Sequence, residues 1–511
     1  MVASLLRVLH SGIQNSRLLP PKGQPNIELF SKVLIRAGRF TTQWVRLDFD
    51  TNPTFGSKAV ITIPRKGHLV SRIYLVSTMP DIDTAQVQAM QIASNNGQEF
   101  VGPKFTWTNS LGHAIIQQAT IDIGGSRVEQ IDGQLMEVLD EFYTPLEKLT
   151  LMNSLIHRNM TNFPQFPLTV RDPFVCYTPL PFWFSKGDPG TFLPIDALAA
   201  DPVKLTIQFA TLSSLYVSSA INFKTELFSG KTYYPLVGSA FYIKDVSGKD
   251  MSGIEGIPLK ATKVSQIPGV QQPTSIPLGD TYLMAEYIYL DAPEANRFRI
   301  SDIEVPITQH YSFDPFDTNG SSRASIPLRI PNPTRNIFFY AQRYEAVGLN
   351  APFLSTRDLS GAGTTLPWWP NAIPINMRSP GIIQPAFVFR DSEPVASAML
   401  VYEGKLVRYS TRSPSIFRSL VPSYEMKKSP FVNRYYYTFH FGLNHGSLAP
   451  SVPSGEANLD KITTISLDLE FKPFRGNSDP NQVPRYIVHV WAQTYNIFRV
   501  YGGRGGMMFA Y

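Results

Sequence analysis

The most constraining feature of this 511-residue chain is a set of short segments in which apolar and polar side chains alternate. In Val203–Phe209 single polar residues separate four apolar ones, and Ile465–Phe471 alternates in the same way. Because successive side chains of a strand point to opposite faces, this period predicts strands with one buried and one solvent-facing side. Such strands need a second layer over their apolar face, which favours a sandwich or barrel.

Strand signals of this kind recur along the whole chain. The segments are short, rich in β-branched and aromatic residues and bounded by turn formers. We expect further strands at Lys58–Pro64, Leu69–Val76, His113–Ile123, Ser126–Ile131, Tyr282–Leu290, Ile337–Gln342, Ala398–Tyr402, Tyr435–Phe441 and Tyr486–Val500. The composition agrees: 12% of residues are aromatic and only 17% are charged, with 42 Pro and 34 Gly. A charge-poor, aromatic chain also suits a protein that covers much of its surface with neighbours.

One region has helix signals instead. Thr144-Pro145-Leu146-Glu147 has the spacing of a capping box with Pro at the first helical position, and it predicts a helix to about Ile156. Asp132–Phe142 is expected to form a short helix before it.

The strands fall into two series, which predicts two large β domains. We expect an N-terminal arm at 1–27, a first domain at 28–225, a linker at 226–235 and a second domain at 236–511. The segment Gly348–Gln384, with many Pro and Gly residues and the pair Trp368-Trp369, is too long for an ordinary connection and is expected to be an elaborated surface loop.

The sequence contains no constellation that predicts catalysis. The single cysteine, Cys176, excludes an internal disulfide framework, and its apolar neighbours predict a buried, unreactive thiol. The eight His have no metal-ligand spacing, and neither a G-x-S-x-G elbow nor a Walker A loop is present. We therefore expect no catalytic, cofactor or metal site and no enzyme. A net charge of +6 without a long basic run predicts no specific nucleic-acid partner.

Both ends of the chain are candidates for interactions. Near the N-terminus, Arg7, Arg17 and Lys22 accompany apolar residues at loosely helical spacing, which is typical of a disordered tail or of an arm that orders against a partner or a membrane surface. Near the C-terminus, Gly502–Gly506 surrounds Arg504 and lacks the residues of a phosphate-binding loop, so we expect a flexible or tightly turning tail.

Six segments occur in an order shared with one protein family. Phe55–Leu75 contains a strand pair around Arg65-Lys66-Gly67-His68-Leu69, where the family usually has Asp at position 68. Trp107–Gly125 is similar to the family's W…LGHALI…E…IGG stretch. Pro179–Leu198 is close to its PLPFWF…NPG…LPLIAL, with Asp188 where Asn is usual, and is the most specific match.

The other three segments lie in the second half: Tyr287–Asp291 with Arg297-Phe298, Pro453–Gly455 with Asn458 and Ile462, and Tyr495–Arg499 with Gly502–Gly506. Together the six span roughly residues 52 to 511. In this order they resemble the major capsid proteins of nucleo-cytoplasmic large DNA viruses.

The resemblance implies an all-β fold of two consecutive eight-stranded jelly rolls, with short helices and long loop insertions. It further implies homotrimers with a pseudo-hexagonal outline. These capsomers would tile an icosahedral virion shell over an internal membrane, bind neighbouring capsomers and minor capsid proteins, and assemble in the host cytoplasm.

Three interaction features follow from the resemblance as hypotheses. The loop with Trp368 and Trp369 is expected in the outer tower or between subunits. The N-terminal arm, with Arg7, Arg17 and Lys22, is expected on the inner face against minor capsid proteins or lipid. The tail with Arg504 is expected to contact a neighbouring subunit. Two alternatives stay open: a minor capsid paralogue of the same fold, or a carbohydrate-binding or carbohydrate-cleaving β-sandwich, which exposed Trp368 and Trp369 would also fit.

Overall fold

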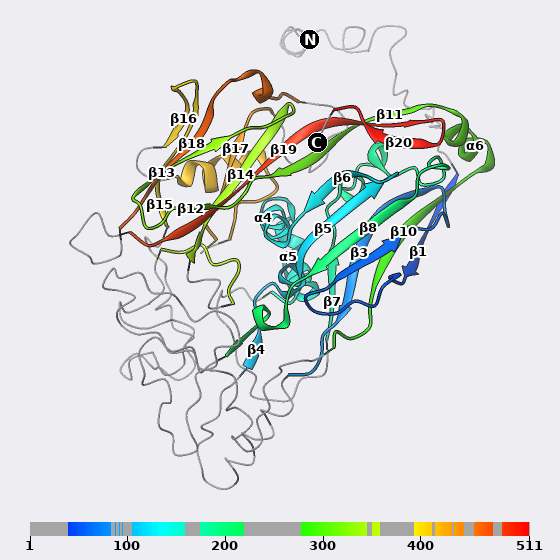
Figure 1. Ribbon diagram of the computed structural model, residues 1–511, viewed down its shortest axis with the longest axis horizontal. Coiled ribbons are helices and arrows are strands. Elements are labelled where there is room, and N and C mark those ends of the chain that lie inside the picture. Colours follow the sequence, from blue (N-terminus) through cyan, green and yellow to red (C-terminus); the bar gives the residue numbers. More distant parts are fainter. Residues whose placement is uncertain are drawn as a thin grey trace, which may run out of the picture. The chain divides into compact units, whose positions relative to one another are not determined.

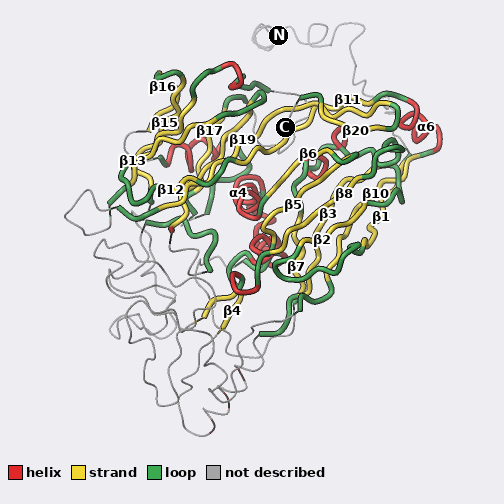
Figure 2. The backbone as a smooth tube through the Cα atoms, in the orientation of Figure 1, coloured by secondary structure: helices red, strands yellow, loops and turns green. Residues whose placement is uncertain are grey.

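The structure is a computed structural model. It describes residues 39–82, 105–158, 174–218, 277–344, 350–357, 393–410, 414–431, 434–443, 454–473 and 483–509, together with Val87, Gln91 and Asn95. The chain divides into two units, Met1–Phe40 and Thr41–Tyr511, and the description below concerns the second together with Phe40. Strands and the loops between them make up most of this unit (Figure 2).

The first jelly roll has two four-stranded sheets. One sheet has the order β1-β10-β3-β7 and the other has the order β2-β8-β5-β6; Figure 2 labels all eight strands. Their bounds are Phe40–Leu47 (β1), Lys58–Thr62 (β2), Leu69–Thr78 (β3), Ile116–Ile123 (β5), Ser126–Ile131 (β6), Val175–Pro179 (β7), Val203–Phe209 (β8) and Thr281–Leu290 (β10).

The second jelly roll repeats this arrangement. Its sheets have the orders β11-β19-β14-β17 and β13-β18-β15-β16. Their bounds are Ile303–Ser312 (β11), Arg323–Leu328 (β13), Thr334–Arg343 (β14), Val395–Tyr402 (β15), Lys405–Ser410 (β16), Tyr436–His440 (β17), Ile465–Phe471 (β18) and Tyr486–Tyr501 (β19). When the eight strands of each jelly roll are counted along the chain, one sheet has the order 1-8-3-6 and the other has the order 2-7-4-5. The predicted double jelly roll is confirmed.

Among the described residues, four short strands lie outside this pattern. β12 (Phe316–Asp317) and β20 (Arg504–Met507) both pair with β19. β4 (Phe105–Trp107) and β9 (Tyr216–Ser218) form a two-stranded sheet of their own.

The alternation in the sequence corresponds to the two faces of the sheets. Every second residue of β8 from Val203 is buried, and β18 follows the same pattern. One hydrophobic cluster fills the second jelly roll. A larger cluster fills the first and also contains Phe338, Tyr340 and Trp491 of the second, so the outer face of one second-roll sheet is buried as well.

The helices that the structure describes in full are short and lie in connections between strands. They are α3 (Leu111–Ala114), α4 (Gly133–Tyr143), α5 (Leu146–Leu155), α6 (Ala292–Ile300) and α7 (Val421–Glu425), with a π-helical turn, η9 (Ile416–Leu420), directly before α7. Single 3₁₀ turns are η1 (Trp183–Ser185), η2 (Pro189–Thr191), η3 (Leu212–Ser214) and η10 (Leu459–Lys461). The helix expected at Asp132–Phe142 is confirmed as α4.

Two local predictions need correction. Helix α5 begins at Leu146 with Pro145 at the cap, and no side chain caps it. Thr144 is not the predicted cap because its hydroxyl donates to the Asp140 carboxylate instead. The strand expected from His113 begins only at Ile116, after the short helix α3.

The expected division between the jelly rolls is also wrong. Residues 226–235, expected as the linker, lie outside the described residues. Strand β10, which was expected to belong to the second domain, pairs antiparallel with β3, with Thr281 opposite Ser77. It therefore completes the first jelly roll, and α6 then leads to β11. Alternation identifies a strand but does not tell which sheet it joins, so the sequence placed this boundary too early.

Candidate functional site

The best-defined polar site is the junction between the two jelly rolls. Helix α4 of the first lies against the outer face of the sheet that contains β14 and β19 (Figure 1). The rings of Phe142 and Tyr143 pack on Phe338 at centroid distances of 5.7 and 6.4 Å. The indole Nε1 of Trp491 donates to Asp132 Oδ2 at 3.0 Å. Apolar packing and hydrogen bonds thus join the two jelly rolls.

The sequence of α4 explains its position. Asp132 caps the helix by accepting a hydrogen bond from the backbone N–H of Leu135. Almost every residue of the helix is buried, including Glu137, Asp140 and Glu141. Residues three and four apart lie on one face of a helix, so these three carboxylates form one acidic surface. A buried acidic surface needs positive partners.

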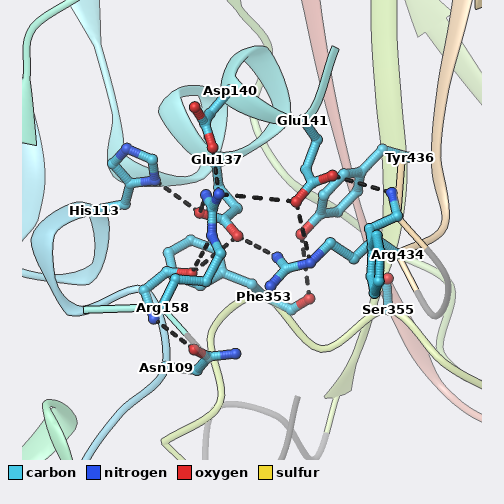
Figure 3. A network of polar contacts seen from close by, with 12 residues as sticks. Asn109, His113, Glu137, Asp140, Glu141, Arg158, Phe353, Ser355, Arg434 and Tyr436 are labelled. Carbon is cyan, nitrogen blue, oxygen red and sulfur yellow. Dashed lines mark hydrogen bonds and ion pairs between the residues drawn. The ribbon is translucent and has the colours of Figure 1, made fainter. Parts of the chain in front are cut away.

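Three cations meet these three carboxylates, and Figure 3 shows two of them, Arg158 and Arg434. Arg158, which follows α5, forms ion pairs with Glu137 and Asp140. Arg434, next to β17, pairs with Glu137, and its Nε lies 3.2 Å from Glu141 Oε1. The ammonium of Lys428 lies 3.6 Å from Glu141 Oε2. Positive and negative charges are therefore balanced within the buried network.

Glu137 is the centre of this network. His113 Nδ1 lies 2.7 Å from its carboxylate, and the Ser110 hydroxyl donates to it at 3.0 Å. Burial alone would raise the pKa of Glu137, but the charges of Arg158 and Arg434 outweigh burial and hold this pKa well below its usual range. The carboxylate is therefore ionised throughout the physiological range.

A second polar layer joins β6 to β11. The Glu129 carboxylate accepts a hydrogen bond from the backbone N–H of Trp183 at 2.9 Å and lies 3.2 Å from His310 Nδ1. The Lys186 ammonium donates to the Thr308 carbonyl at 2.8 Å. Burial lowers the pKa of Lys186 to about 8 and that of His310 to about 4. The imidazole is therefore neutral at pH 7.

The ion pairs of this network hold α4 in place against Arg158 and Arg434. Breaking one partner of such a buried network leaves an uncompensated charge, which costs about 3–5 kcal/mol. Within the described residues no three His, Cys, Asp or Glu side chains are grouped to hold a metal ion. Cys176 is buried as expected, and burial raises the pKa of its thiol to about 12.

The predicted interaction residues do not take part in this junction. Arg7, Arg17, Lys22, Trp368 and Trp369 lie outside the described residues. Arg504 is exposed at the start of β20, which folds back on β19 through a Gly502-Gly503 turn. The C-terminal tail is thus a tight hairpin.

This hairpin lies against the first jelly roll. The backbone N–H of Gly505 donates to Asp201 Oδ2 at 3.0 Å, and that of Ala200 donates to the Gly503 carbonyl at 2.9 Å. A contact of Arg504 with a neighbouring subunit stays a prediction.

Sequence reasoning missed the junction itself. Its partners lie far apart in the sequence: Glu137 and Arg434 are separated by 297 positions. The available signal was the spacing of Glu137, Asp140 and Glu141 in a helix whose other residues are mostly apolar.

No described helix has the length and apolar character needed to cross a membrane.

Two jelly rolls of the same strand order, joined by a buried polar network, define the double jelly-roll fold, which solved capsid proteins share. The family models agree. Residues 28–291 match "Major capsid protein N-terminus" and residues 296–506 match "Large eukaryotic DNA virus major capsid protein". The chain belongs to this family of large eukaryotic DNA virus major capsid proteins. The two matches meet at α6, in agreement with the place of β10 in the first jelly roll.

Relatives match over the whole chain. "Probable capsid protein 4" of Acanthamoeba polyphaga mimivirus is 22% identical over an alignment of 579 residues, covering 100% of this chain and 99% of the relative. The "Major capsid protein" of Pyramimonas orientalis virus is 22% identical over 515 residues and covers both chains fully. A chain of the PBCV-1 virus capsid, 19% identical, has the same fold with a TM-score of 0.64, covering 95% of this chain and 100% of that one. The protein is a structural component of the virion that assembles with other capsid subunits, and it is not an enzyme.

Proposed function

We propose that this protein forms homotrimers with a pseudo-hexagonal outline, and that these capsomers tile an icosahedral shell. The observation that carries the proposal is the repeated strand order of the two jelly rolls. Each chain supplies two similar jelly rolls. Three chains around a threefold axis therefore place six similar domains in a ring. The contact in such a ring is heterologous, so each subunit uses two different surfaces and the ring closes.

The test is the mass of the purified protein in solution by light scattering, followed by negative-stain imaging of the same fraction. A particle of three chain masses with a hexagonal outline is the expected result. A monodisperse monomer at all accessible concentrations would contradict the trimer.

The proposal also covers the binding partners of the trimer and the segments that contact them. Neighbouring capsomers and minor capsid proteins bind the trimer, and the N-terminal arm with Arg7, Arg17 and Lys22 lies on the inner face against those proteins or the internal membrane. The loop with Trp368 and Trp369 contributes to the outer tower or a subunit contact, and Arg504 contacts a neighbour. Assembly takes place in the host cytoplasm. Support comes from the family and from the basic, acid-poor composition of the arm.

A further inference from the structure

Two of the sheets turn charged side chains away from the core of their own jelly roll. They are the sheets of β2, β8, β5 and β6 in the first jelly roll and of β13, β18 and β15 in the second. We call the outward side chains of these strands the first charged face and the second charged face. A surface that stays in water until finished particles meet is usually polar, whereas a permanent contact is largely apolar. The two charged faces therefore suit contacts between capsomers that have already formed.

The first charged face has an excess of cations. Along β8, buried residues alternate with Lys204, Thr206 and Gln208, and Lys58 of β2 is exposed opposite Gln208. Polar side chains alone line an open hollow of about 200 Å³ in this face, among them Lys58, Asp122 and Arg127. Asp122 lies opposite Arg127 on one side and Lys204 on the other. Three cations and one carboxylate leave this face with two positive charges in excess.

The second charged face has the opposite sign. Strand β18 is the seventh strand of its jelly roll, as β8 is of the first, and its outward residues are Ser466, Asp468 and Glu470. The guanidinium of Arg323 lies 2.9 Å from Glu470. The donor to Asp468 is a neutral group, the Ser325 hydroxyl at 2.6 Å. Two carboxylates and one cation leave this face with one negative charge in excess.

The order of the jelly rolls around a trimer determines which of these faces can meet. First and second jelly rolls alternate around a threefold axis, so opposite sides of the capsomer belong to different jelly rolls. Two capsomers in the same orientation therefore bring a first charged face to a second charged face. If one of them turns by one sixth of a full rotation, like faces meet instead.

We infer that the first charged face of one capsomer binds the second charged face of the next, and that their opposite charges select neighbours in the same orientation. The inference rests on the proposed trimer and adds the chemistry by which trimers bind one another. Lys58 and Lys204 on one side and Asp468 on the other carry the attraction. Complementary charges of this kind mainly determine which surfaces pair and in which register. Like faces repel, so the rotated arrangement is disfavoured.

The contact should depend strongly on salt. Exposed ion pairs contribute little each, and dissolved ions screen them. The screening length is about 10 Å in about 0.1 M salt and about 3 Å in about 1 M salt. We therefore expect purified capsomers to attract one another at the lower salt concentration and to lose most of this attraction at the higher one. Static light scattering over a concentration series measures the attraction as the second virial coefficient.

Charge reversal with rescue tests the pairing of the two faces. The full-length variant Lys58→Glu/Lys204→Glu has two acidic faces, and Asp468→Lys has two basic ones. We expect each variant alone to lose the attraction of the wild type. An equal mixture of the two preformed capsomers should regain it, because an acidic face of one then meets a basic face of the other.

The net charge of the chain cannot produce this pattern. Lys58→Glu/Lys204→Glu changes the charge from +6 to 6 − 4 = +2. If net charge governed association, this variant would attract itself more than the wild type does. The matched control Lys66→Glu/Arg297→Glu makes the same change at exposed positions outside both faces, in the turn after β2 and in α6. We expect it to keep the wild-type attraction. Circular dichroism melting and the particle mass confirm that each variant folds and forms trimers.

The outcomes separate this inference from the proposed function. Trimers of the wild type that do not attract one another at the lower salt concentration overturn the inference and leave the trimer intact. The same conclusion follows if the reversed variants associate like the control, or if their mixture does not regain the attraction. A wild-type protein that stays monomeric overturns both.

Discussion

Arg434 of the second jelly roll forms a buried ion pair with Glu137 of the first, across 297 positions of sequence. We predict that Arg434→Met lowers the free energy of unfolding by about 3–5 kcal/mol, because the carboxylate loses one of its compensating cations inside the protein. Urea denaturation measures the loss. The control is Arg323→Met, which removes an exposed pair with Glu470 and costs less than about 1 kcal/mol. Equal losses in the two variants would contradict the role assigned to the junction.

Acid should destabilise the protein through His310. Burial lowers the pKa of His310 to about 4; the charges of Lys186 and Arg335 add to this effect and Glu129 opposes it. Between pH 6.5, the usual pKa of histidine, and pH 4, the unfolded chain binds a proton that the folded chain does not. Stability therefore falls as pH decreases through this window, by at most about 1.4 kcal/mol per pH unit from this residue.

Urea denaturation at several pH values between 4 and 7 checks this dependence. The variant His310→Gln should have a shallower slope than the wild type, whatever its stability at pH 7. Parallel curves for the two proteins would rule out His310 as the source.

The C-terminal hairpin should tolerate a larger side chain at one glycine and not at its neighbour. A Cβ on Gly505 would lie 2.5 Å from a methyl group of Leu198 and 3.0 Å from one of Ile123, whereas a Cβ on Gly506 meets nothing within 4 Å. We predict that Gly505→Val lowers the free energy of unfolding by about 1–3 kcal/mol. Gly506→Val, the matched control, should have a much smaller effect in the same urea titration.

Removal of the N-terminal arm should separate trimer formation from shell assembly. Deletion of residues 2–26 removes Arg7, Arg17 and Lys22 but leaves β1 and both jelly rolls. We expect trimers of normal mass by light scattering and few closed shells by electron microscopy when the variant is expressed with its viral partners. Normal shells from the deletion variant would count against a role for the arm.

The loop with Trp368 and Trp369 provides a further test. Replacing both with Ser should shift the monomer–trimer equilibrium toward monomer, since aromatic side chains are enriched in interface cores. Analytical ultracentrifugation over a concentration series measures the shift. If the trimer of the double variant is as stable as that of the wild type, the loop does not lie between subunits.

The strands could be predicted because their signal is local. Alternation along β8 and β18 reflects which face of each sheet is covered, and a window of seven residues contains it. Helix α4 was also predictable from its own residues, with Asp132 at its cap.

What could not be predicted depends on partners that are distant in sequence. The place of β10 beside β3 and the partners of Glu137 both follow from how whole sheets pack. A carboxylate on a helix usually faces solvent. Only the fold reveals that Arg158 and Arg434 enclose this one.

The late position of β10 has a consequence for synthesis. This strand lies between β1 and β3, and β1 has no other neighbour in its sheet. From Thr78 at the end of β3 to Thr281 at the start of β10, the ribosome must add 281 − 78 = 203 residues. At roughly 5–20 residues per second this takes about 10–40 s. During that time the place between β1 and β3 is empty, and the edges of these two strands that face it are unpaired. A product that stops before residue 281 would never fill this place.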